Sequence, residues 1–191
     1  LFRSSAASDV YKRQGYGLKR FEFMYNNWLI VGPRKAKTEI NIRGNEIREI
    51  METIYDKKEK FISRGDNSGT HMKELSLWKE LALVPEEFQK TWYLETGSGQ
   101  GATLMIANEL EAFTITDTAT WHSFKNKGGS EIVGYDNKDL NTYAITTVNP
   151  KKCKNIKSTA VEKIVTFLKS NNGKNTISKF RLNNANAFFP I

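Results

Sequence analysis

The sequence is poor in the residues that bind metals or form covalent cross-links. Cys153 is the only cysteine among 191 residues, so the chain can form neither an intrachain disulfide nor a cluster of thiolate ligands. His71 and His122, the two histidines, are too few and too far apart for a metal site without help from carboxylates. No run of about 18 apolar residues occurs, so no segment is predicted to span a bilayer. We therefore expect neither a bound metal nor a cofactor.

Signatures of common catalytic sites are also missing. The chain contains no G-x-S-x-G nucleophile turn and no H-E-x-x-H helix. Cys153 lies in the polar turn PKKCKN without an arranged base. His71 lies near a predicted helix N-terminus, which disfavours a protonated imidazole. We therefore predict a binding protein rather than an enzyme.

Basic residues are plentiful, and the formal net charge is +8. Such a balance raises the question of a polyanionic partner. The lysines are scattered along the chain, however, and no motif that reads RNA or DNA accompanies them. We therefore predict a solvated lysine-rich surface and no nucleic-acid partner. The hydrophobic content of 39%, with four tryptophans and eleven phenylalanines, is enough for a core and favours one domain, or one domain and part of another.

Strand and helix patterns alternate through the middle of the chain. The apolar run WLIVG (28–32) is typical of a strand that is covered on both faces. Residues 45–55 have apolar side chains at the spacing of an amphipathic helix. The other predicted elements are strands at 60–63, 91–95, 113–116, 131–134 and 142–148, and helices at 69–82, 100–111, 158–170 and 174–180. This alternation predicts a mainly parallel α/β sheet with helices on both faces.

Two of these helices have a predicted inward stripe of apolar residues. In the helix 69–82 the stripe consists of Met72, Leu75, Trp78, Leu81 and Ala82. In the helix 100–111 it consists of Ala102, Met105, Ile106 and Leu110.

The stretch 63–70 joins a predicted strand to a predicted helix and is rich in hydrogen-bond donors. The first N–H groups of a helix lack internal partners and carry the positive end of its dipole, so they form a site for anions. Ser68 and Thr70 add hydroxyls, and Arg64 adds a planar guanidinium suited to a tetrahedral oxyanion. Ordinary helix capping, with Arg64 paired to Asp66 or Asp117, accounts equally for these residues.

A second glycine-rich turn, GSGQGATL (97–104), repeats this arrangement with a hydroxyl at Thr103. It matches neither a Walker loop nor a full G-x-G-x-x-G fingerprint. In open α/β sheets ligands bind at the carboxyl ends of strands, so two such turns can share one pocket of N–H donors. A tight turn without a ligand is the alternative. A third turn, TITDTATW (114–121), carries Asp117, which we expect to cap a short helix or to hold Arg64.

Several segments resemble the tungstate-binding proteins of ABC-type oxyanion importers, which have the type II periplasmic-binding-protein fold. These segments are GYGLKRFEFMYNNWLIVGP (15–33), FISRGDNSGTHMKELSLWK (61–79), WYLETGSGQGATLMIANELEAFTITDTATW (92–121), VNP (148–150) and FRLNNANAFFP (180–190). The pattern SRGD-x-SGTH-x-x-EL is the most specific of them. The resemblance runs from residue 15 to the end of the chain.

The resemblance implies that two α/β lobes close on a tetrahedral anion, tungstate or molybdate. It places the arginine of the motif at Arg64 and small hydrogen-bond donors at Ser63, Ser68, Gly69, Thr70, Gly101, Ala102 and Thr103. It also implies a membrane permease as partner and a periplasmic or membrane-anchored extracellular location. A ligand-sensing regulatory domain of the same fold and an anion-handling transferase are the alternatives.

The two ends of the chain bear on its expected domain organisation. Residues 4–14, SSAASDVYKRQ, are identified as the in-frame translation of a transposon-type sequencing adapter, so we treat 1–14 as an artefact rather than native protein. The resemblance then implies one complete α/β lobe at 33–147 and, at 15–32 and 148–191, only the C-terminal part of the other lobe, with the signal segment missing. We expect apolar side chains at Phe167, Phe180, Phe188 and Phe189 to be left exposed. We also expect the chain alone to bind anions weakly or not at all.

Overall fold

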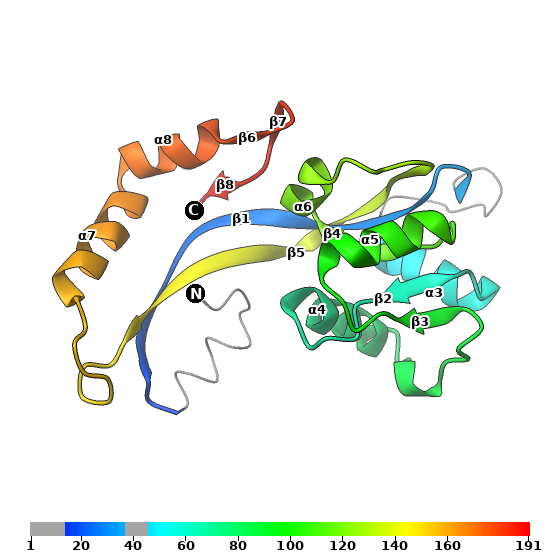
Figure 1. Ribbon diagram of the computed structural model, residues 1–191, viewed down its shortest axis with the longest axis horizontal. Helices are drawn as coiled ribbons and strands as arrows, with labels where there is room; N and C mark the ends of the chain where they lie inside the picture. Colours follow the sequence, from blue (N-terminus) through cyan, green and yellow to red (C-terminus); the bar gives the residue numbers. More distant parts are fainter. Residues whose placement is uncertain (1–13, 37–45) are drawn as a thin grey trace. The chain divides into compact units, whose positions relative to one another are not determined.

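The computed structural model describes residues 14–36 and 46–191, and Figure 1 shows the order of its elements along the chain. The chain divides into two compact units, residues 27–140 and residues 1–26 with 141–191. Strands β1 (Gly17–Pro33) and β5 (Ser130–Val148) each contain a boundary between the units. Residues 1–13 of the adapter-like segment lie outside the described residues.

The unit 27–140 alternates short strands with helices. Outside the undescribed stretch 37–45, its helices include α3 (Ile47–Lys57), α4 (Gly69–Glu80), the 3-10 helix η1 (Pro85–Glu87), α5 (Gln100–Glu109) and α6 (Thr118–Ser123). Besides parts of β1 and β5, its strands are β2 (Phe61–Ser63), β3 (Tyr93–Glu95) and β4 (Thr114–Asp117). The α/β alternation predicted from the sequence is therefore confirmed.

The sheet of this unit mixes parallel and antiparallel strands. β2 pairs with β3 in parallel, and a parallel bridge joins Phe61 to Phe113, just before β4. β1, in contrast, pairs antiparallel with β4, with Trp28 opposite Asp117, and β5 lies on the other side of β1. The prediction of a mainly parallel sheet is therefore wrong for the part built on β1. β1 precedes the alternating segment and is not joined to β4 by a single crossover helix, the connection that makes neighbouring strands parallel.

β5 is one strand of 19 residues, whereas the sequence predicts two strands, at 131–134 and 142–148. The polar stretch between them, YDNKDLN (135–141), lacks the apolar alternation by which a half-buried strand is recognised. Most of these side chains are exposed. The strand continues because sheet hydrogen bonds form between backbone groups and do not require apolar side chains.

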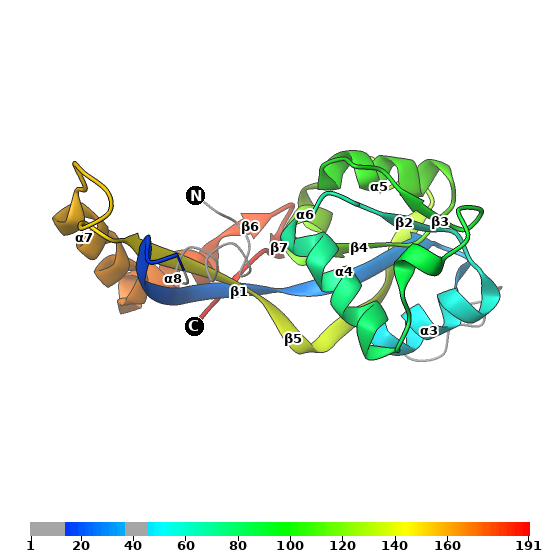
Figure 2. The same cartoon turned by 90° about the horizontal axis from the view of Figure 1, so that it is seen from below.

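Helices cover both faces of this sheet, with α5 and α6 on one face and α3 and α4 on the other (Figure 2). Consecutive residues of β1 supply apolar side chains to both faces. Leu29 and Val31 pack with Leu104 and Trp121, whereas Ile30 belongs to the cluster that includes α3 and α4. Successive side chains of a strand point to opposite faces, so a strand between two helical layers needs a continuous apolar run. The prediction of a strand covered on both faces is confirmed.

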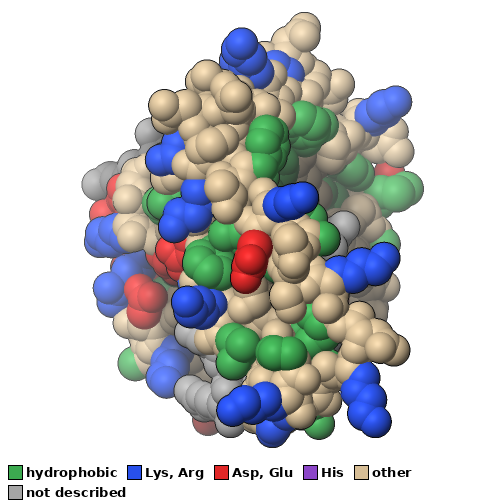
Figure 3. Space-filling view, turned by 90° about the vertical axis from the view of Figure 1, so that its left-hand side faces the viewer, with side chains coloured by type: hydrophobic (Ala, Val, Ile, Leu, Met, Phe, Trp, Pro, Cys, Tyr) green, Lys and Arg blue, Asp and Glu red, His purple; other side chains and the backbone are tan. Residues whose placement is uncertain are grey.

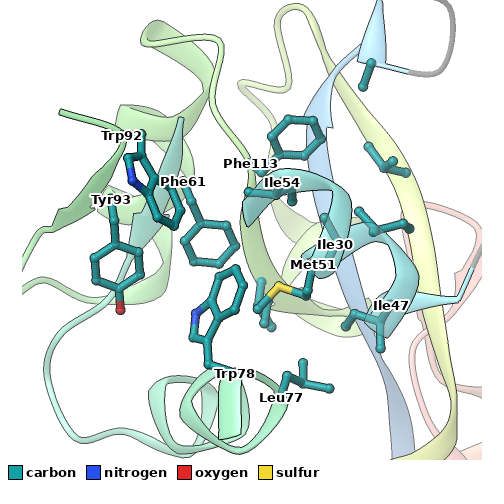
Figure 4. Close-up of a cluster of buried hydrophobic side chains, with 14 of the residues drawn as sticks. Ile30, Ile47, Met51, Ile54, Phe61, Leu77, Trp78, Trp92, Tyr93 and Phe113 are labelled. Carbon is teal, nitrogen blue, oxygen red and sulfur yellow. The ribbon is translucent and has the colours of Figure 1, made fainter. Parts of the chain in front are cut away.

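The larger core cluster lies between the sheet and helices α3 and α4, as Figure 4 shows. Phe61 stacks on Tyr93 with ring centroids 5.9 Å apart and meets the edge of Trp78 at 5.5 Å. Of the five apolar residues that the sequence spacing places on one face of α3, Ile47, Ile50, Met51 and Ile54 are buried, whereas Tyr55 is only partly buried.

The inward stripe predicted for α4 is wrong in part. Trp78 is buried as expected, but Met72 is 43% exposed. Lys73 and Glu74 are buried instead, together with His71. Lys73 and Glu74 are buried because they have polar partners on other elements, Asp136 and Tyr93. The apolar pattern of α4 gives no sign of these partners.

The inward stripe predicted for α5 is wrong throughout. The residues predicted to point inward, Ala102, Met105, Ile106 and Leu110, are all exposed. The buried residues of α5 are Thr103, Leu104 and Ala107. Thr103 fixes this orientation because its hydroxyl bonds to Gly99 O at 3.2 Å and to Thr96 Oγ1 at 3.1 Å, inside the preceding turn.

In the unit formed by residues 1–26 and 141–191, the described residues, from 14 onward, include two helices and several short strands. Helices α7 (Ser158–Lys169) and α8 (Asn171–Lys179) pack on each other, and β6 (Arg181–Leu182) pairs antiparallel with β7 (Ala185–Asn186). β8 (Phe189–Pro190) pairs antiparallel with β1, where Tyr25 and Phe189 stack at 5.4 Å.

Apolar side chains remain at the surface of this unit. Phe167 and Phe180 are each 49% exposed, as expected from the sequence, and Ile164 is 53% exposed. Phe188 and Phe189 are partly buried instead, because they pack on Tyr143 and Tyr25. Figure 3 shows lysine and arginine side chains spread over one face of the molecule with hydrophobic side chains between them, so this face agrees with the predicted scatter of charge.

Gly32 lies where β1 passes closest to a core aromatic ring, and this gives a first prediction. A Cβ at Gly32 would lie 2.4 Å from Cδ1 of Phe113, which is 1% exposed and closely packed. Gly32→Ala is expected to lower the free energy of unfolding by about 1–3 kcal/mol, because the ring must leave its position. Urea denaturation followed by tryptophan fluorescence measures the loss. Gly129→Ala is the control, since a Cβ there meets nothing within 4 Å. Equal losses in the two variants would contradict the prediction.

Candidate functional site

The loop between β2 and α4 has a backbone that suits its residues. Gly65 has a φ of +60°, and a Cβ there would lie 2.9 Å from Cβ of Glu95, so both the conformation and the space require glycine. Asn67 has a φ of 56°, which asparagine tolerates better than most residues. Ser68 caps α4, because its Oγ accepts a hydrogen bond from His71 N at 3.3 Å. The predicted strand, turn and capped helix are therefore confirmed.

Three contacts hold the Arg64 side chain, two with residues between β2 and the start of α4 and one with Gln100 at the start of α5. Its Nη2 donates to Asp66 Oδ2 at 2.5 Å, and its Nη1 lies 3.4 Å from Gln100 Oε1 and 3.5 Å from Thr70 Oγ1. The side chain is only 17% exposed, so the guanidinium is not turned out into bulk water. Of the two carboxylates that the sequence offers as partners, Asp66 is the one that pairs with it.

The guanidinium of Arg64 keeps hydrogen-bonding capacity beyond this ion pair. The contacts of Nη1 with Gln100 and Thr70 are long for hydrogen bonds from a charged donor. Its Nε is buried and has no hydrogen-bond partner in the part of the chain that the structure describes. A buried N–H without a partner is costly, and an acceptor oxygen of a ligand would satisfy it.

Asp66 stays ionised beside Arg64. Burial raises the pKa of its carboxyl, but hydrogen bonds from Ser68 and the charge of Arg64 outweigh that effect and lower the pKa below its ordinary value. Ser68 N donates to Asp66 Oδ1 at 3.1 Å. Asp66 therefore orients the guanidinium and offsets part of its charge.

Asp117 is occupied at a different helix. Its Oδ1 accepts hydrogen bonds from the N–H groups of Ala119 and Thr120 at 3.0 and 3.1 Å, and its Oδ2 accepts one from the Thr120 hydroxyl at 2.5 Å. These bonds cap α6, so the capping role predicted for Asp117 is confirmed.

The second glycine-rich turn lies beside the first, as the contact between Gln100 of the second turn and Arg64 of the first shows. Besides its contact with Arg64, Gln100 donates from Nε2 to Ile115 O at 2.8 Å. α5 begins at Gln100, and its N-cap, Gly99, provides no side-chain hydrogen bond. The first N–H groups of α5 therefore lack a side-chain cap. They lie close to the Arg64 guanidinium, which also has N–H groups available for a ligand. Gln100 is not among the site residues predicted from the sequence, because its contact with Arg64 joins residues 36 positions apart.

Two of the predicted donors face the protein interior. Ser63 and Thr103 are both fully buried. Ser63 Oγ accepts a hydrogen bond from Gly65 N at 3.2 Å, and Thr103 is bonded within its own turn. These two hydroxyls hold the turns in shape. The other predicted donors lie at the starts of the two helices: Ser68, Gly69 and Thr70 at α4, and Gly101 and Ala102, both exposed, at α5.

Glu74 is a buried carboxyl next to this site. It is 2% exposed, and its Oε1 accepts hydrogen bonds from Tyr93 Oη at 2.6 Å and from Trp78 Nε1 at 3.2 Å. Burial raises the pKa of Glu74 to about 7, although hydrogen bonds from Tyr93, Ser63 and Trp78 act in the opposite direction. Glu74 is not among the site residues predicted from the sequence. Its spacing of four residues from both Thr70 and Trp78, which places the three on one helix face, was the available signal.

The donor set suits an anion rich in oxygen. It consists of N–H and O–H groups with one guanidinium, the groups that bind oxyanions in proteins. Within residues 14–36 and 46–191, no group of three or more His, Cys, Asp and Glu side chains could hold a metal ion. None of the helices described in these residues has the length and apolar character needed to cross a membrane.

Comparison with known proteins identifies the family. The model of the PBP superfamily domain matches residues 2–171. The chain is 35% identical over 190 residues to the tungstate-binding protein TupA of Campylobacter jejuni, covering 97% of this chain and 69% of the relative. The chain belongs to the TupA family of the PBP superfamily. This membership confirms both the resemblance seen in the sequence and the predicted fold class.

Two further relatives agree with the TupA assignment. TupA of Peptoclostridium acidaminophilum is 36% identical over 185 residues, covering 94% of this chain and 63% of the relative. The solved structure of the tungstate ABC transporter from Geobacter sulfurreducens matches with a TM-score of 0.80 at 33% identity, covering 94% of this chain and 75% of that one. The chain spans about two thirds of the length of the curated TupA relatives, 69% and 63%.

Proposed function

We propose that this TupA-family chain is the substrate-binding component of an ABC-type importer and that it holds a tetrahedral oxyanion, tungstate or molybdate, at the N-termini of α4 and α5. One observation carries the proposal. Arg64 contacts Thr70 and Gln100, at the starts of the two helices, and its Nε has no partner among the described residues. A permanent positive charge with spare donors thus lies between two helix N-termini. The names of the TupA relatives support tungstate as the ligand.

In the proposed binding mode, hydrogen bonds from the protein replace those that water makes to the free anion. Arg64, Ser68, Gly69, Thr70, Gly101 and Ala102 are the proposed donors to the anion. Ser68 Oγ already accepts from His71 N, which leaves its own hydroxyl proton free to be donated. Ser63 and Thr103 act indirectly, because their buried hydroxyls hold the two turns. All these groups bind without reacting, so we infer that the site performs no catalysis.

The domain organisation is part of the proposal. We infer that the lobe predicted at 33–147 corresponds to the unit 27–140, and that the native residues of the other unit form the C-terminal part of an incomplete lobe. The exposure of Phe167 and Phe180 and the share of the TupA relatives that the chain spans support this inference. Donors from one lobe alone should bind an anion weakly. A periplasmic or extracellular location and a membrane permease as partner follow from the same assignment.

Replacing Arg64 tests the proposed site. Arg64→Ala is expected to weaken tungstate binding by about 10- to 150-fold, because hydrogen bonds to charged groups contribute about 1.5–3 kcal/mol. Titration with tungstate at about pH 8, followed by backbone amide chemical shifts, detects weak as well as tight binding. The largest shifts are expected at Gly69 and Gly101.

Arg48→Ala is the matched control, because this exposed arginine of α3 lies in the same unit and its side chain donates to a backbone carbonyl, Glu80 O, rather than to either helix N-terminus of the proposed site. Its tungstate affinity should equal that of the unmodified chain. Equal affinities in Arg64→Ala and Arg48→Ala would show that the anion binds elsewhere and would overturn the proposed site.

A further inference from the structure

Glu74 combines deep burial with the lack of a neutralising charge. No Lys or Arg forms an ion pair with it among the described residues. The groups that face it are Tyr93 and Trp78, which donate to its Oε1, the Ser63 hydroxyl, and the negative charge of Glu95. Glu95 itself contacts Lys90, at 3.4 Å. A buried carboxylate in such surroundings is costly to ionise, so protonation is the available way to remove its charge.

Ser63 lies between Glu74 and the proposed anion site. The Ser63 hydroxyl is close enough to Glu74 to act on its carboxyl, in the direction that lowers the pKa. Ser63 Oγ in turn accepts the N–H of Gly65 at 3.2 Å. Arg64 lies between Ser63 and Gly65 in the sequence. One buried serine therefore separates the carboxyl from the loop that carries the guanidinium.

We propose that the Glu74 carboxyl takes up a proton from solvent when an oxyanion binds beside Arg64, and that this uptake makes anion affinity depend on pH. The inference rests on the proposed function. Two negative charges brought together in a poorly solvated region repel each other, and neutralising one of them removes the repulsion. A protonated Glu74 still has oxygen lone pairs to accept from Tyr93 and Trp78, so its neighbours keep their partners.

The other ionisable groups near the loop are less able to take this role. Asp66 is paired with Arg64 and its pKa is lowered, so it stays ionised. His71 Nδ1 accepts the N–H of Asn67 at 3.0 Å, so this nitrogen is already engaged within the loop. Lys73, the neighbour of Glu74 on α4, is paired with Asp136 and has a raised pKa. Glu74 is thus a carboxyl beside this loop whose charge can change near neutral pH.

The direction of the pH effect follows from linkage. Without an anion, Glu74 titrates at about pH 7 rather than at its ordinary 4.5. A bound dianion favours the protonated form and raises the pKa further. Affinity is therefore highest below about pH 7 and falls as the pH rises through that value, by at most tenfold per pH unit for one proton.

The first test needs no ligand. Trp78 donates its indole N–H to Glu74, so the indole resonance should shift with ionisation of the carboxyl, with a midpoint near pH 7. Glu74→Gln should abolish this titration while leaving the circular dichroism spectrum unchanged. Tyr93→Phe, which removes a donor to the carboxylate, should move the midpoint upward. A Trp78 resonance that titrates equally in the Glu74→Gln variant would overturn the inference.

The second test measures binding of molybdate, a tetrahedral dianion, by amide chemical shifts at about pH 6.5 and about pH 8.5. The unmodified chain is expected to lose about tenfold or more in affinity between these values, and Glu74→Gln less than twofold. Glu87→Gln, at an exposed position outside the groups that face Glu74, is the control and should keep the full pH dependence. Binding with the same pH dependence in Glu74→Gln and the unmodified chain would overturn the inference alone. One lobe should bind the anion weakly but detectably by this method, so the absence of any molybdate-dependent shift at both pH values would overturn the proposed function and the inference with it.

Discussion

Replacing Lys73 by methionine is expected to lower the free energy of unfolding of the unit 27–140 by about 3–5 kcal/mol. Lys73 Nζ lies 2.7 Å from Asp136 Oδ2 and 2.9 Å from Asp139 Oδ2, and the side chains of Lys73 and Asp136 are 6% and 5% exposed. Methionine fills a similar volume but leaves the Asp136 carboxylate buried without a counter-charge. Urea denaturation followed by circular dichroism measures the loss.

A second substitution separates the lost ion pair from lost packing. Asp136 Oδ1 also accepts the N–H groups of Lys138 and Asp139, at 2.9 and 3.0 Å. Asp136→Asn keeps an oxygen for those bonds but removes the charge, so adding it to Lys73→Met should restore most of the stability. Lys79→Met, at an exposed position of α4, is the control and should change stability by less than about 0.5 kcal/mol. A double variant as unstable as Lys73→Met would show that packing, not the unpaired charge, dominates.

The lowered pKa of Asp136 and the raised pKa of Lys73 determine the pH range in which Lys73→Met shows its full effect on stability. Burial raises the pKa of Asp136, but hydrogen bonds from Lys73 and from backbone N–H groups outweigh it and bring the pKa below 3.8. The pKa of Lys73 lies above 10.5, because its bonds to Asp136 and Asp139 outweigh burial. The contribution of Asp136 is lost as the pH falls through its lowered pKa, and that of Lys73 as the pH rises through its raised pKa. The stability difference should therefore be constant between about pH 4 and about pH 10 and shrink outside that range.

Periodicity predicts the elements of unit 27–140 well because local patterns determine them. The spacing of Ile47, Ile50, Met51 and Ile54 indicates both the existence of α3 and its buried face. The run Leu29–Val31 indicates a strand between two helical layers, because each face of β1 meets apolar side chains. Helix and strand patterns of this kind depend on residues a few positions apart, which a sequence displays directly.

The errors arise where a distant polar partner outweighs the apolar pattern. Lys73 and Glu74 turn inward on α4 because Asp136 and Tyr93, 63 and 19 residues further along the chain, supply an ion pair and a hydrogen bond. On α5, the hydroxyl of Thr103 is used within its own turn, and this rotates the more apolar stripe outward. An apolar pattern carries no information about such pairings, so it cannot predict that Lys73 is buried while Met72 is exposed.

The residues of the candidate site likewise fall into those that local sequence patterns predict and those that depend on contacts between distant segments. Arg64 and the two helix N-termini were predicted because glycine, hydroxyl and arginine residues cluster locally in the sequence. Gln100, which joins the two turns, and Glu74, which faces Ser63 from inside, were missed. Both act through contacts between segments, and a single sequence does not show which segments meet. The residues that would bind the anion are therefore easier to predict than those that would position them.

Phe61→Ala is expected to lower the free energy of unfolding by about 3–5 kcal/mol, the usual cost of removing a buried aromatic ring. Phe61 is fully buried, and its ring stacks on Tyr93 with an angle of 4° between the planes and meets Trp78 edge-on at 73°. Its removal leaves a cavity and forfeits two aromatic contacts, each contributing about 0.5–1.5 kcal/mol beyond burial. Phe180→Ala is the control, because that ring is 49% exposed and its loss should cost less than about 1 kcal/mol.

The consequences of Phe61→Ala should reach the candidate site, because Phe61 begins the strand that ends at Ser63. Tyr93 and Trp78, the two rings against Phe61, are also the two donors to Oε1 of Glu74. A cavity at Phe61 lets both rings shift, so the Glu74 carboxyl should lose part of its hydrogen bonding and its pKa should rise above about 7. Phe61→Leu, which fills more of the space, should retain more stability and move the midpoint less. The Trp78 indole resonance reports this midpoint, and a Phe61→Ala variant that loses stability with no change in it would show that the core and the site network are independent.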